Sequence, residues 1–437
     1  MTAADGPIAP RRVAVVGAGW AGLAAAVRAV QAGHAVTLLE MAAHPGGRAR
    51  GVNVDGLALD NGQHILIGAY TRTLALMQTV GADAQALFCR LPLVLRYPDG
   101  RGLRAPGGAA VPSFARAVAG CVGWTWRDRI ALLATASGWA LRRFRCDPAL
   151  TVDDLCRHLP PAVRQLLIDP LCVAALNTPA RDASAAVLLR VLRDALFSGP
   201  GSADLLLPRQ ALGELLPAPA RRWLAAAGVA AHFGKRVVEI AAVPAPGTGW
   251  RVDGEAFDGV VLACSAAEAA RLTAGLAPAW SARAAALGYE PIITVYLRCP
   301  GARLAEPMLA LVESDNAPAQ FVFDHGALGA TPGVFAFVIS GARRWVDAGA
   351  EATAAATLHQ ATTAFPASTW PHPPELLRVM AEKRATFRCT PGLDRPPAVI
   401  APGLLAAGDY VAGPYPATLE GAVRSGEDAA AALGHIR

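Results

Sequence analysis

The chain has 437 residues, long enough for two or three domains at about 150 residues each. Hydrophobic residues make up 53% of it and the mean hydropathy is +0.34, yet no stretch reaches the roughly 18 consecutive apolar residues that a membrane-spanning helix requires. The formal net charge is +6, but nearly all basic residues are arginines and they are dispersed. Composition therefore argues against a membrane-spanning protein and gives no support to nucleic-acid binding.

The eight cysteines occur singly, without a CxxC pair or metal-ligand spacing. We therefore expect reduced, mostly buried thiols and no metal site. The two arginines near the N-terminus precede a glycine-punctuated strand rather than the apolar region and cleavage site of a signal peptide. This pattern favours a cytoplasmic protein.

The first motif is a glycine-rich loop between an apolar run and a helix-like segment. Residues 13–16 are apolar, residues 17–22 read Gly-Ala-Gly-Trp-Ala-Gly, and residues 23–31 have a helical pattern. A second strand-like run over 34–39 ends at Glu40. The order predicts a complete βαβ unit with a dinucleotide-binding fingerprint, which is far more specific than an isolated GxGxxG.

Each residue of this fingerprint has a physical role. Gly17 permits the tight turn, Gly19 lets the backbone approach a pyrophosphate, and Gly22 allows close packing of helix on strand. The helix N-terminus faces the anion. Glu40 is placed to accept hydrogen bonds from a ribose hydroxyl.

Directly after this unit, the chain reads Pro45, Gly46, Gly47 and Arg48. This resembles the GG-plus-Arg motif of the large FAD family that includes amine oxidases and phytoene desaturases. Paired glycines let backbone amides lie against a cofactor, and an arginine supplies charge to its phosphate or flavin. The resemblance implies FAD rather than NAD. No cysteine or histidine position indicates covalent attachment, so we expect FAD to be held non-covalently.

Two distant segments resemble the rest of that family's FAD domain. Residues 228–240 resemble the segment that passes the adenine, where Val238 would make contact through its backbone. At the C-terminus, an apolar run ends in Gly408-Asp409, and a new helix is expected to begin near Thr418 and Leu419. Asp409 would bind the ribityl or phosphate region. The N–H groups at the helix start would face the flavin and stabilise its anionic reduced form.

One loop indicates which branch of this flavoprotein family the chain resembles. The phrase Asp60-Asn61-Gly62-Gln63-His64, an apolar run and Gly68-Ala69-Tyr70 is similar to the hydroxysqualene dehydroxylases of bacterial hopanoid synthesis, also called squalene-associated FAD-dependent desaturases. Supporting phrases lie at 203–208, 383–387 and 408–426, so the likeness covers essentially the whole chain. In this family the loop, including Gln63, lies close to the isoalloxazine ring.

The resemblance implies that reduced FAD removes the hydroxyl group of hydroxysqualene, giving squalene, water and oxidised FAD. Such chemistry needs an acid to help hydroxide leave, a dry pocket, and hydride from flavin N5. His64 is the first candidate acid and Asp60 the second. Alternatively, Asp60 braces the loop and His64 is a hydrogen-bonded pocket residue. Tyr70, Tyr289 and Tyr415 could line the pocket or serve packing.

The predicted fold is α/β: a Rossmann-like FAD-binding domain of the amine oxidase and glutathione reductase type, with an inserted α+β substrate domain. The FAD domain is expected over residues 1–90, 205–285 and 396–437, and the substrate domain over 91–204 and 286–395. An extended apolar isoprenoid would bind between them. The tryptophans and arginines at 124–145 could contact the inner face of the cytoplasmic membrane peripherally, or could serve core packing.

Other functions stay open at this stage. The nearest rival is a carotenoid or dehydrosqualene desaturase that abstracts hydride from a polyene. An amine oxidase is disfavoured because its catalytic lysine would have to be Lys235 or Lys383. A non-catalytic prenyl or lipid carrier shares this fold but lacks the full flavin-binding set. Since the chain has one dinucleotide fingerprint, an external, unidentified donor must supply the electrons.

Overall fold

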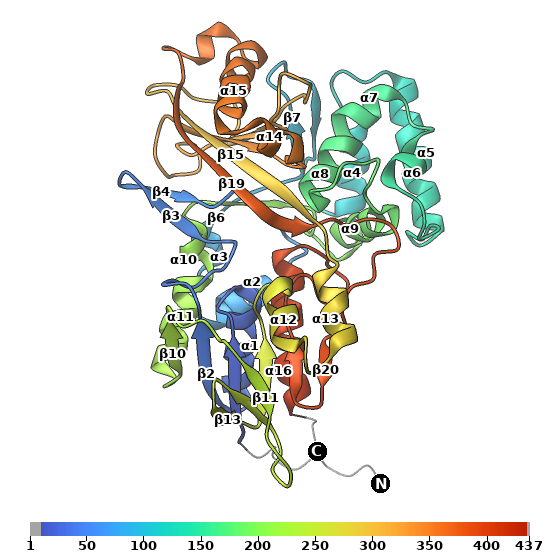
Figure 1. The fold of residues 1–437 in the computed structure, drawn as a ribbon. Helices are drawn as coiled ribbons and strands as arrows, with labels where there is room; N and C mark the ends of the chain where they lie inside the picture. The colour runs from blue at the N-terminus through green and yellow to red at the C-terminus, as the bar shows by residue number, and fades with distance from the viewer. Residues whose placement is uncertain (1–9, 435–437) are drawn as a thin grey trace.

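The computed structural model describes residues 10–434 and places a six-stranded sheet at the centre of one half of the molecule (Figure 1). The strand order is β10-β2-β1-β14-β21-β20, and all neighbours are parallel except β20, which runs antiparallel to β21. The strands come from three distant parts of the chain: β1 (Arg12–Val16), β2 (Ala35–Glu40), β10 (Ala230–Phe233), β14 (Gly259–Leu262), β20 (Val399–Ala401) and β21 (Leu404–Ala406).

Successive side chains of β1 point alternately into two hydrophobic cores, one on each face of the sheet. Val13 and Val15 pack with α1 (Trp20–Gln31), α11 (Pro217–Ala226) and α16 (Leu419–Leu433) on one face of the sheet. Ala14 and Val16 face the other core, which includes residues of the small sheet β11 (Ile240–Ala242), β12 (Trp250–Val252) and β13 (Glu255–Phe257), and of α12 (Ala266–Thr273) and α13 (Pro278–Ala285). Burial on both faces explains why the parallel strands are continuous apolar runs.

A second, antiparallel sheet forms the upper part of the molecule in Figure 1. Its order is β16-β17-β18-β15-β19, and α14 (Arg343–Ala348) and α15 (Ala350–Ala364) pack against it. The strands are β15 (Tyr289–Arg298), β16 (Met308–Ala310), β17 (Phe321–Asp324), β18 (Val334–Ile339) and β19 (Glu375–Phe387). The long edge strand β19 runs down toward the six-stranded sheet.

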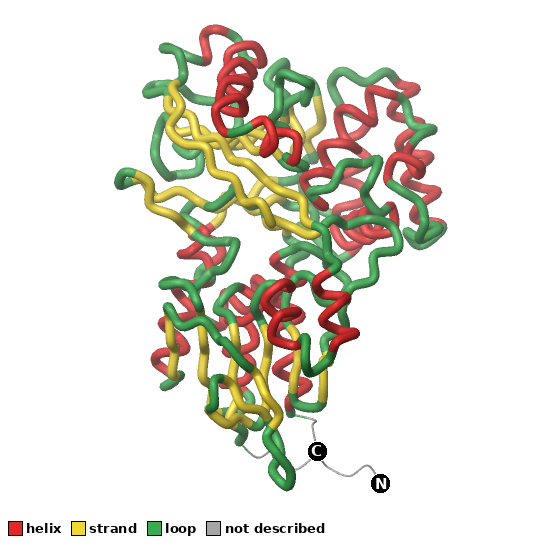
Figure 2. The backbone as a smooth tube through the Cα atoms, in the orientation of Figure 1, coloured by secondary structure: helices red, strands yellow, loops and turns green. Residues whose placement is uncertain are grey.

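A helical lobe lies beside this second sheet, as the secondary-structure colours of Figure 2 show. It contains α4 (Ala110–Ala119), α5 (Trp126–Leu141), α6 (Val152–Cys156), α7 (Pro161–Val163), a π-helical turn (Arg164–Ile168), α8 (Asp169–Leu176) and α9 (Ala185–Phe197). In the described part of the chain, none of these or the other helices is both long and apolar enough to cross a membrane.

Short elements lie between the two halves. They are the hairpin β3 (Gly51–Val54)–β4 (Leu57–Asp60), the three-stranded sheet of β5 (Leu66–Ile67), β9 (Leu205–Pro208) and β6 (Phe88–Leu91), and the helices α2 (Thr71–Thr79), α3 (Ala84–Leu87) and α10 (Leu212–Leu215). The hairpin β7 (Val94–Arg96)–β8 (Gly102–Arg104) instead contacts β16 of the second sheet and α4 of the helical lobe. The predicted α/β class is therefore confirmed, with an antiparallel sheet and a helical lobe added to the doubly wound core.

Candidate functional site

The glycine loop after β1 adopts the predicted tight turn. Gly17 has φ +108°, and a Cβ placed there would lie 2.6 Å from the carbonyl oxygen of Ala263. At Gly22 a Cβ would lie 1.8 Å from the carbonyl oxygen of Gly17, so only glycine lets the helix approach the turn. Gly19 caps α1 without any side-chain hydrogen bond, and a Cβ there would meet nothing closer than 3.9 Å. The helix N-terminus thus faces open space suited to an anion.

Glu40 at the end of β2 ties this loop to the sheet. Its carboxylate is buried and accepts hydrogen bonds from the backbone N–H groups of Ala18 at 2.6 Å and Ala42 at 2.8 Å. A carboxylate offers about four lone-pair positions, so it can still accept from a ribose hydroxyl. The predicted role of Glu40 fits this geometry.

The GG-plus-Arg loop packs directly against the glycine turn. The N–H of Gly46 donates to the carbonyl oxygen of Ala18 at 2.8 Å, and both Gly46 and Gly47 have positive φ. A Cβ at Gly47 would lie 3.2 Å from the Cα of Gly19. The paired glycines therefore let two cofactor-facing backbone segments approach each other closely.

Arg48 joins three remote segments. Its guanidinium forms an ion pair with Asp409 at 2.5 Å and donates to the carbonyl oxygen of Ala385, near the end of β19, at 2.7 Å. Burial disfavours the charge of Arg48, but the nearby carboxylate of Asp409 outweighs that effect and raises the pKa. The predicted cofactor residues Arg48 and Asp409 are thus direct partners, a contact that the sequence did not reveal.

The C-terminal segment presents a helix start beside this pair. Thr418 is the N-cap of α16, its hydroxyl oxygen accepts from the N–H of Gly421 at 2.9 Å, and Leu419 is the first helical residue. The preceding Ala417 has φ 56°, an uncommon conformation for a residue other than glycine. Such strain at the entrance to a helix is typical of functional sites.

Asp60 lies at the end of β4 and is buried. Its carboxylate accepts from the N–H of Leu212 at 2.7 Å, and the hydroxyl of Tyr296 donates to its backbone oxygen at 3.0 Å. Burial raises the pKa of Asp60 to about 7. The side chain both braces the loop and holds a titratable proton near neutral pH.

His64 occupies the same loop and is half-buried. Its Nδ1 lies 2.9 Å from the carbonyl oxygen of Gly62, so this nitrogen carries the proton and Nε2 is free to accept. Burial lowers the pKa of His64; the hydrogen bond to Gly62 opposes this, and the charge of Arg48 adds to it. The resting imidazole is therefore neutral at neutral pH.

Two polar atoms beside these residues are buried without a partner among the described residues: Oε1 of Gln63 and the hydroxyl of Tyr410. Buried polar groups normally have a hydrogen-bond partner, so each of these two atoms could accept a polar ligand as its partner. Together with the open space at Gly19, they fit the polar edge of a flavin dinucleotide. We expect Gly17, Gly19, Gly46, Gly47, Arg48, Gln63 and Asp409 to hold it.

The structure gives less support to the predicted adenine contact. Val238 follows β10, its N–H donates to Asp253 at 2.9 Å and its carbonyl oxygen accepts from Arg271 at 2.9 Å. Because both backbone groups already have partners, an adenine contact through Val238 would have to share or replace these bonds. This contact stays a prediction.

Sequence reasoning missed several supporting residues. Tyr296 lies on β15 and Leu212 starts α10, and neither carries a motif that would mark it as a neighbour of Asp60. Asn61 donates from Nδ2 to Glu382 of β19 at 3.0 Å, linking the loop to the second sheet. Tyr415, expected as a pocket or packing residue, lies against the guanidinium groups of Arg424 and Arg190.

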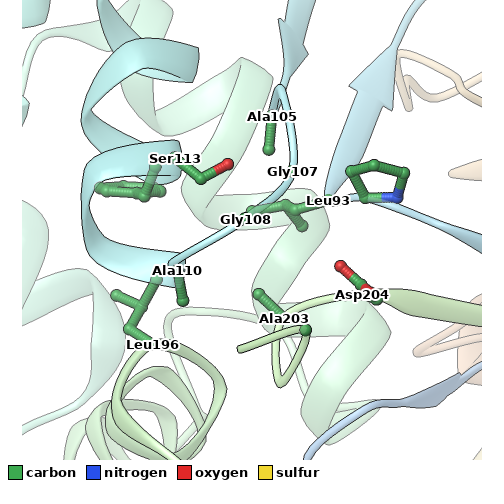
Figure 3. A pocket seen from close by; sticks show the side chains of 12 residues that line it. Leu93, Ala105, Gly107, Gly108, Ala110, Ser113, Leu196, Ala203 and Asp204 are labelled. Carbon is green, nitrogen blue, oxygen red and sulfur yellow. The ribbon is translucent and has the colours of Figure 1, made fainter. Parts of the chain in front are cut away.

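Two cavities lie outside the site formed by the glycine loop and the segment Gly46-Gly47-Arg48. A cleft of about 350 Å³ opens between the β3–β4 hairpin and β19, within the size range of ligand pockets. Its lining is Val52, Asn53, Val54, Asn61, Arg378, Val379, Met380 and Ala381. The crevice in Figure 3, lined by Leu93, Phe114, Leu196 and neighbours in the helical lobe, has a volume of about 10 Å³ and holds at most a water molecule. The cleft beside Asn61, rather than this crevice, adjoins the predicted site.

Comparison with known families agrees with this geometry. A profile of the family described as "Flavin containing amine oxidoreductase" matches residues 20–434. The chain belongs to this family and is a flavin-dependent oxidoreductase. Solved structures of the same fold include an oxidoreductase from Methanosarcina mazei (16% identical, TM-score 0.73, 95% of this chain and 99% of that chain) and putrescine oxidase bound to putrescine (18%, TM-score 0.66, 97% and 99%).

Curated relatives define the branch. Hydroxysqualene dehydroxylase of Rhodopseudomonas palustris is 30% identical, with 96% of this chain and 97% of the relative covered, and that of Zymomonas mobilis is 29% identical, with 96% and 99% covered. Zeta-carotene desaturase of Synechocystis is 46% identical, but over only 72 residues, 16% of this chain and 15% of the relative. The full-length likeness places the chain in the hydroxysqualene dehydroxylase family, and the predicted family is confirmed.

Proposed function

We propose that the chain reductively removes the hydroxyl group of hydroxysqualene and releases squalene, with FAD bound non-covalently. The carbon–oxygen bond breaks, a carbon–hydrogen bond forms, the flavin is oxidised by two electrons, and the departing hydroxide takes up a proton to become water. The observation that carries this proposal is likeness over 96% of the chain to relatives of that name, whereas the desaturase likeness covers 16%.

Different residues of this site would bind different parts of the cofactor. Gly19, the start of α1 and Glu40 would bind the adenosine diphosphate half, and Arg48 with Asp409 would bind the flavin half. When bound in its reduced form, the flavin would supply the hydride. The N-terminus of α16, beginning at Leu419, would favour negative charge beside it.

The proton must come from a group near the reacting carbon, and two candidates are at hand. His64 is the first candidate from the sequence, but its Nε2 carries a proton only when the ring is charged, and its lowered pKa moves that state to acidic pH. Asp60 is the second, since its pKa of about 7 leaves it partly protonated at neutral pH. The pH profile separates them: a charged His64 would lose its proton below the usual histidine value near 6.5, and Asp60 would lose its proton near 7.

The cleft between β3 and β19 is the candidate substrate position beside the loop. Its lining combines Val52, Val54, Val379 and Met380 with polar Asn53, Asn61 and Arg378, and Asn61 links it to the loop of His64. We propose that part of the isoprenoid chain lies there, and that a separate donor re-reduces the flavin.

The test is product analysis with chemically reduced protein in excess over synthetic hydroxysqualene. The proposal expects squalene, identified by mass and chromatographic retention. A more unsaturated product from a polyene substrate, with no squalene from hydroxysqualene, would instead assign the chain to the desaturases.

A further inference from the structure

Helix α5 in the helical lobe carries a stripe of exposed apolar side chains. Trp126 is 65% exposed, Ile130 56% and Leu141 86%. Exposed Ala134 and Ser137 lie between them at spacings of three and four residues, so all five share one face of the helix. A capping box at Thr125 and Asp128 fixes the start of α5. The stripe therefore belongs to an ordered helix rather than to a loop.

The apolar surface extends beyond α5. Val122 is 47% exposed just before the helix, and Phe197 is 54% exposed at the end of α9. The rings of Phe144 and Phe197 meet edge to face at 5.4 Å, which joins the end of α9 to the chain that follows α5. Half of the large hydrophobic side chains that the described residues expose lie between positions 111 and 197. Such concentration marks an interaction surface.

The exposed charges around this surface are mostly basic, and Asp147 is the one exposed acid within residues 122–147. Arg127, Arg142, Arg143 and Arg145 are exposed, and within residues 10–434 no carboxylate forms an ion pair with any of them. Elsewhere in the lobe, by contrast, Asp194 pairs with two arginines and Asp153 with one. The one acidic residue of α5, Asp128, is buried in the capping box.

We propose that this face, defined by Val122, Trp126, Ile130, Leu141 and Phe197 with its rim of arginines, docks on an anionic lipid surface. Exposed apolar side chains on this face would enter the headgroup region while the arginines reach lipid phosphates. The guanidinium of Arg127 lies 5.5 Å from the ring centre of Trp126, which keeps charge and apolar surface together at one depth.

Charge argues against a second copy of the chain as the occupant. A two-fold interface would bring two arginine-rich faces together, with Asp147 as the one exposed acid within residues 122–147 to offset the repulsion. The inference is independent of the reaction proposed above, since docking requires no turnover.

The experiment is flotation of the flavin-loaded protein with vesicles of phosphatidylcholine alone or mixed with phosphatidylglycerol. We expect binding to the mixed vesicles and release at high salt. W126S/I130S/L141S should lose binding, whereas the matched control V312S/L376S, which replaces exposed hydrophobics elsewhere, should bind like the parent. R142Q/R143Q/R145Q should bind about 100-fold more weakly, from about fivefold for each arginine near an anionic surface.

Flavin absorbance and thermal unfolding check that the variants are folded. A blue shift of tryptophan fluorescence on mixed vesicles, present in the parent and reduced in W126F, gives a second measurement without the triple variant. Failure of the parent to float with mixed vesicles, or equal flotation of W126S/I130S/L141S, would overturn the proposal. So would a dimer that the same substitutions dissociate, because the face would then be a protein interface.

Discussion

Asp60 joins parts of the molecule that are far apart in sequence, and its carboxyl group is the clearest titratable group beside the proposed flavin site. Tyr296, 236 residues away, donates to its backbone, and the N–H of Leu212 donates to its side chain. A buried carboxyl with one hydrogen bond is held less strongly as an anion than in water, which is why its pKa rises.

Asp60→Asn should flatten the pH dependence of stability. Because the pKa of Asp60 is raised from 3.8 to about 7, the folded state holds this proton more tightly than the unfolded chain. Its stabilising contribution is complete below the unfolded pKa and is lost as the pH rises through about 7. Asparagine keeps an acceptor for Leu212 without titrating, so up to about 4 kcal/mol of pH-dependent free energy of unfolding should disappear.

Urea unfolding at about pH 4 and about pH 8 measures the effect. Asp347→Asn, at an exposed carboxylate on α14, is the control and should leave the pH dependence of the parent unchanged. If Asp60→Asn retained the full slope of the parent between these pH values, the raised pKa would be incorrect.

His64→Ala tests the first candidate acid. The protein should keep its flavin, since Arg48, Asp409 and the glycine loop remain, while loss of the hydroxyl group should slow by about 100-fold or more in a single turnover. Stopped-flow absorbance of the flavin provides the rate. His359→Ala, at an exposed position of α15, should behave like the parent. An unchanged rate in His64→Ala would remove this residue from proton transfer.

For single residues, the sequence identified the side chains of the flavin site but not the residues that they contact. Gly17, Glu40, Arg48 and Asp409 were predictable because each belongs to a local motif with a fixed spacing. The ion pair of Arg48 with Asp409 and the contact of Tyr296 with Asp60 were not, because they depend on how distant segments fold together.

The turn between β1 and α1 is the element on which cofactor binding depends. Its glycines do two different jobs: Gly22 lies against backbone, and Gly19 borders open space. Gly22→Ala should therefore destabilise the fold, since a Cβ would lie 1.8 Å from a carbonyl oxygen, whereas Gly19→Ala should leave thermal stability unchanged and weaken flavin binding. Isothermal titration of the flavin-free protein, together with thermal unfolding, measures both effects.

Gly138→Ala in α5 is the matched control, since nothing lies within 4 Å of its added Cβ. It should keep flavin affinity and raise stability slightly, because alanine favours helix. Equal flavin affinity in Gly19→Ala and the parent would show that the pyrophosphate lies elsewhere.

Elements with a strong local pattern were predicted well. The strands β1 and β2 lie within one residue of their expected limits, because apolar runs mark them, whereas α1 begins at Trp20, three residues earlier than expected. The long strand β19 was not foreseen as a strand, because its alternating exposed and half-buried residues, with several charges, reflect an edge position. Only Asp258 separates β13 from β14, yet these two strands belong to different sheets.

The whole molecule brings three remote segments into one sheet, and the sequence had grouped these segments because each resembles part of the same FAD domain. The strands of that sheet lie inside the ranges expected for the FAD domain. The packing of the helical lobe against the second sheet could not be predicted, since its helices are patterned only by hydrophobicity, which fixes a buried face but not its partner. The sequence marked the tryptophans and arginines at 124–145, but only the structure shows that Trp126 is exposed while Trp124 and Trp139 are buried.

The most direct test of the proposed reaction follows the flavin and the product together in one anaerobic experiment. Photoreduced protein is mixed with hydroxysqualene while flavin absorbance is followed and squalene is quantified. We expect the flavin to be reoxidised, and one squalene to form for each flavin that is oxidised. Flavin that stays reduced in the presence of hydroxysqualene, with no squalene formed, would contradict it.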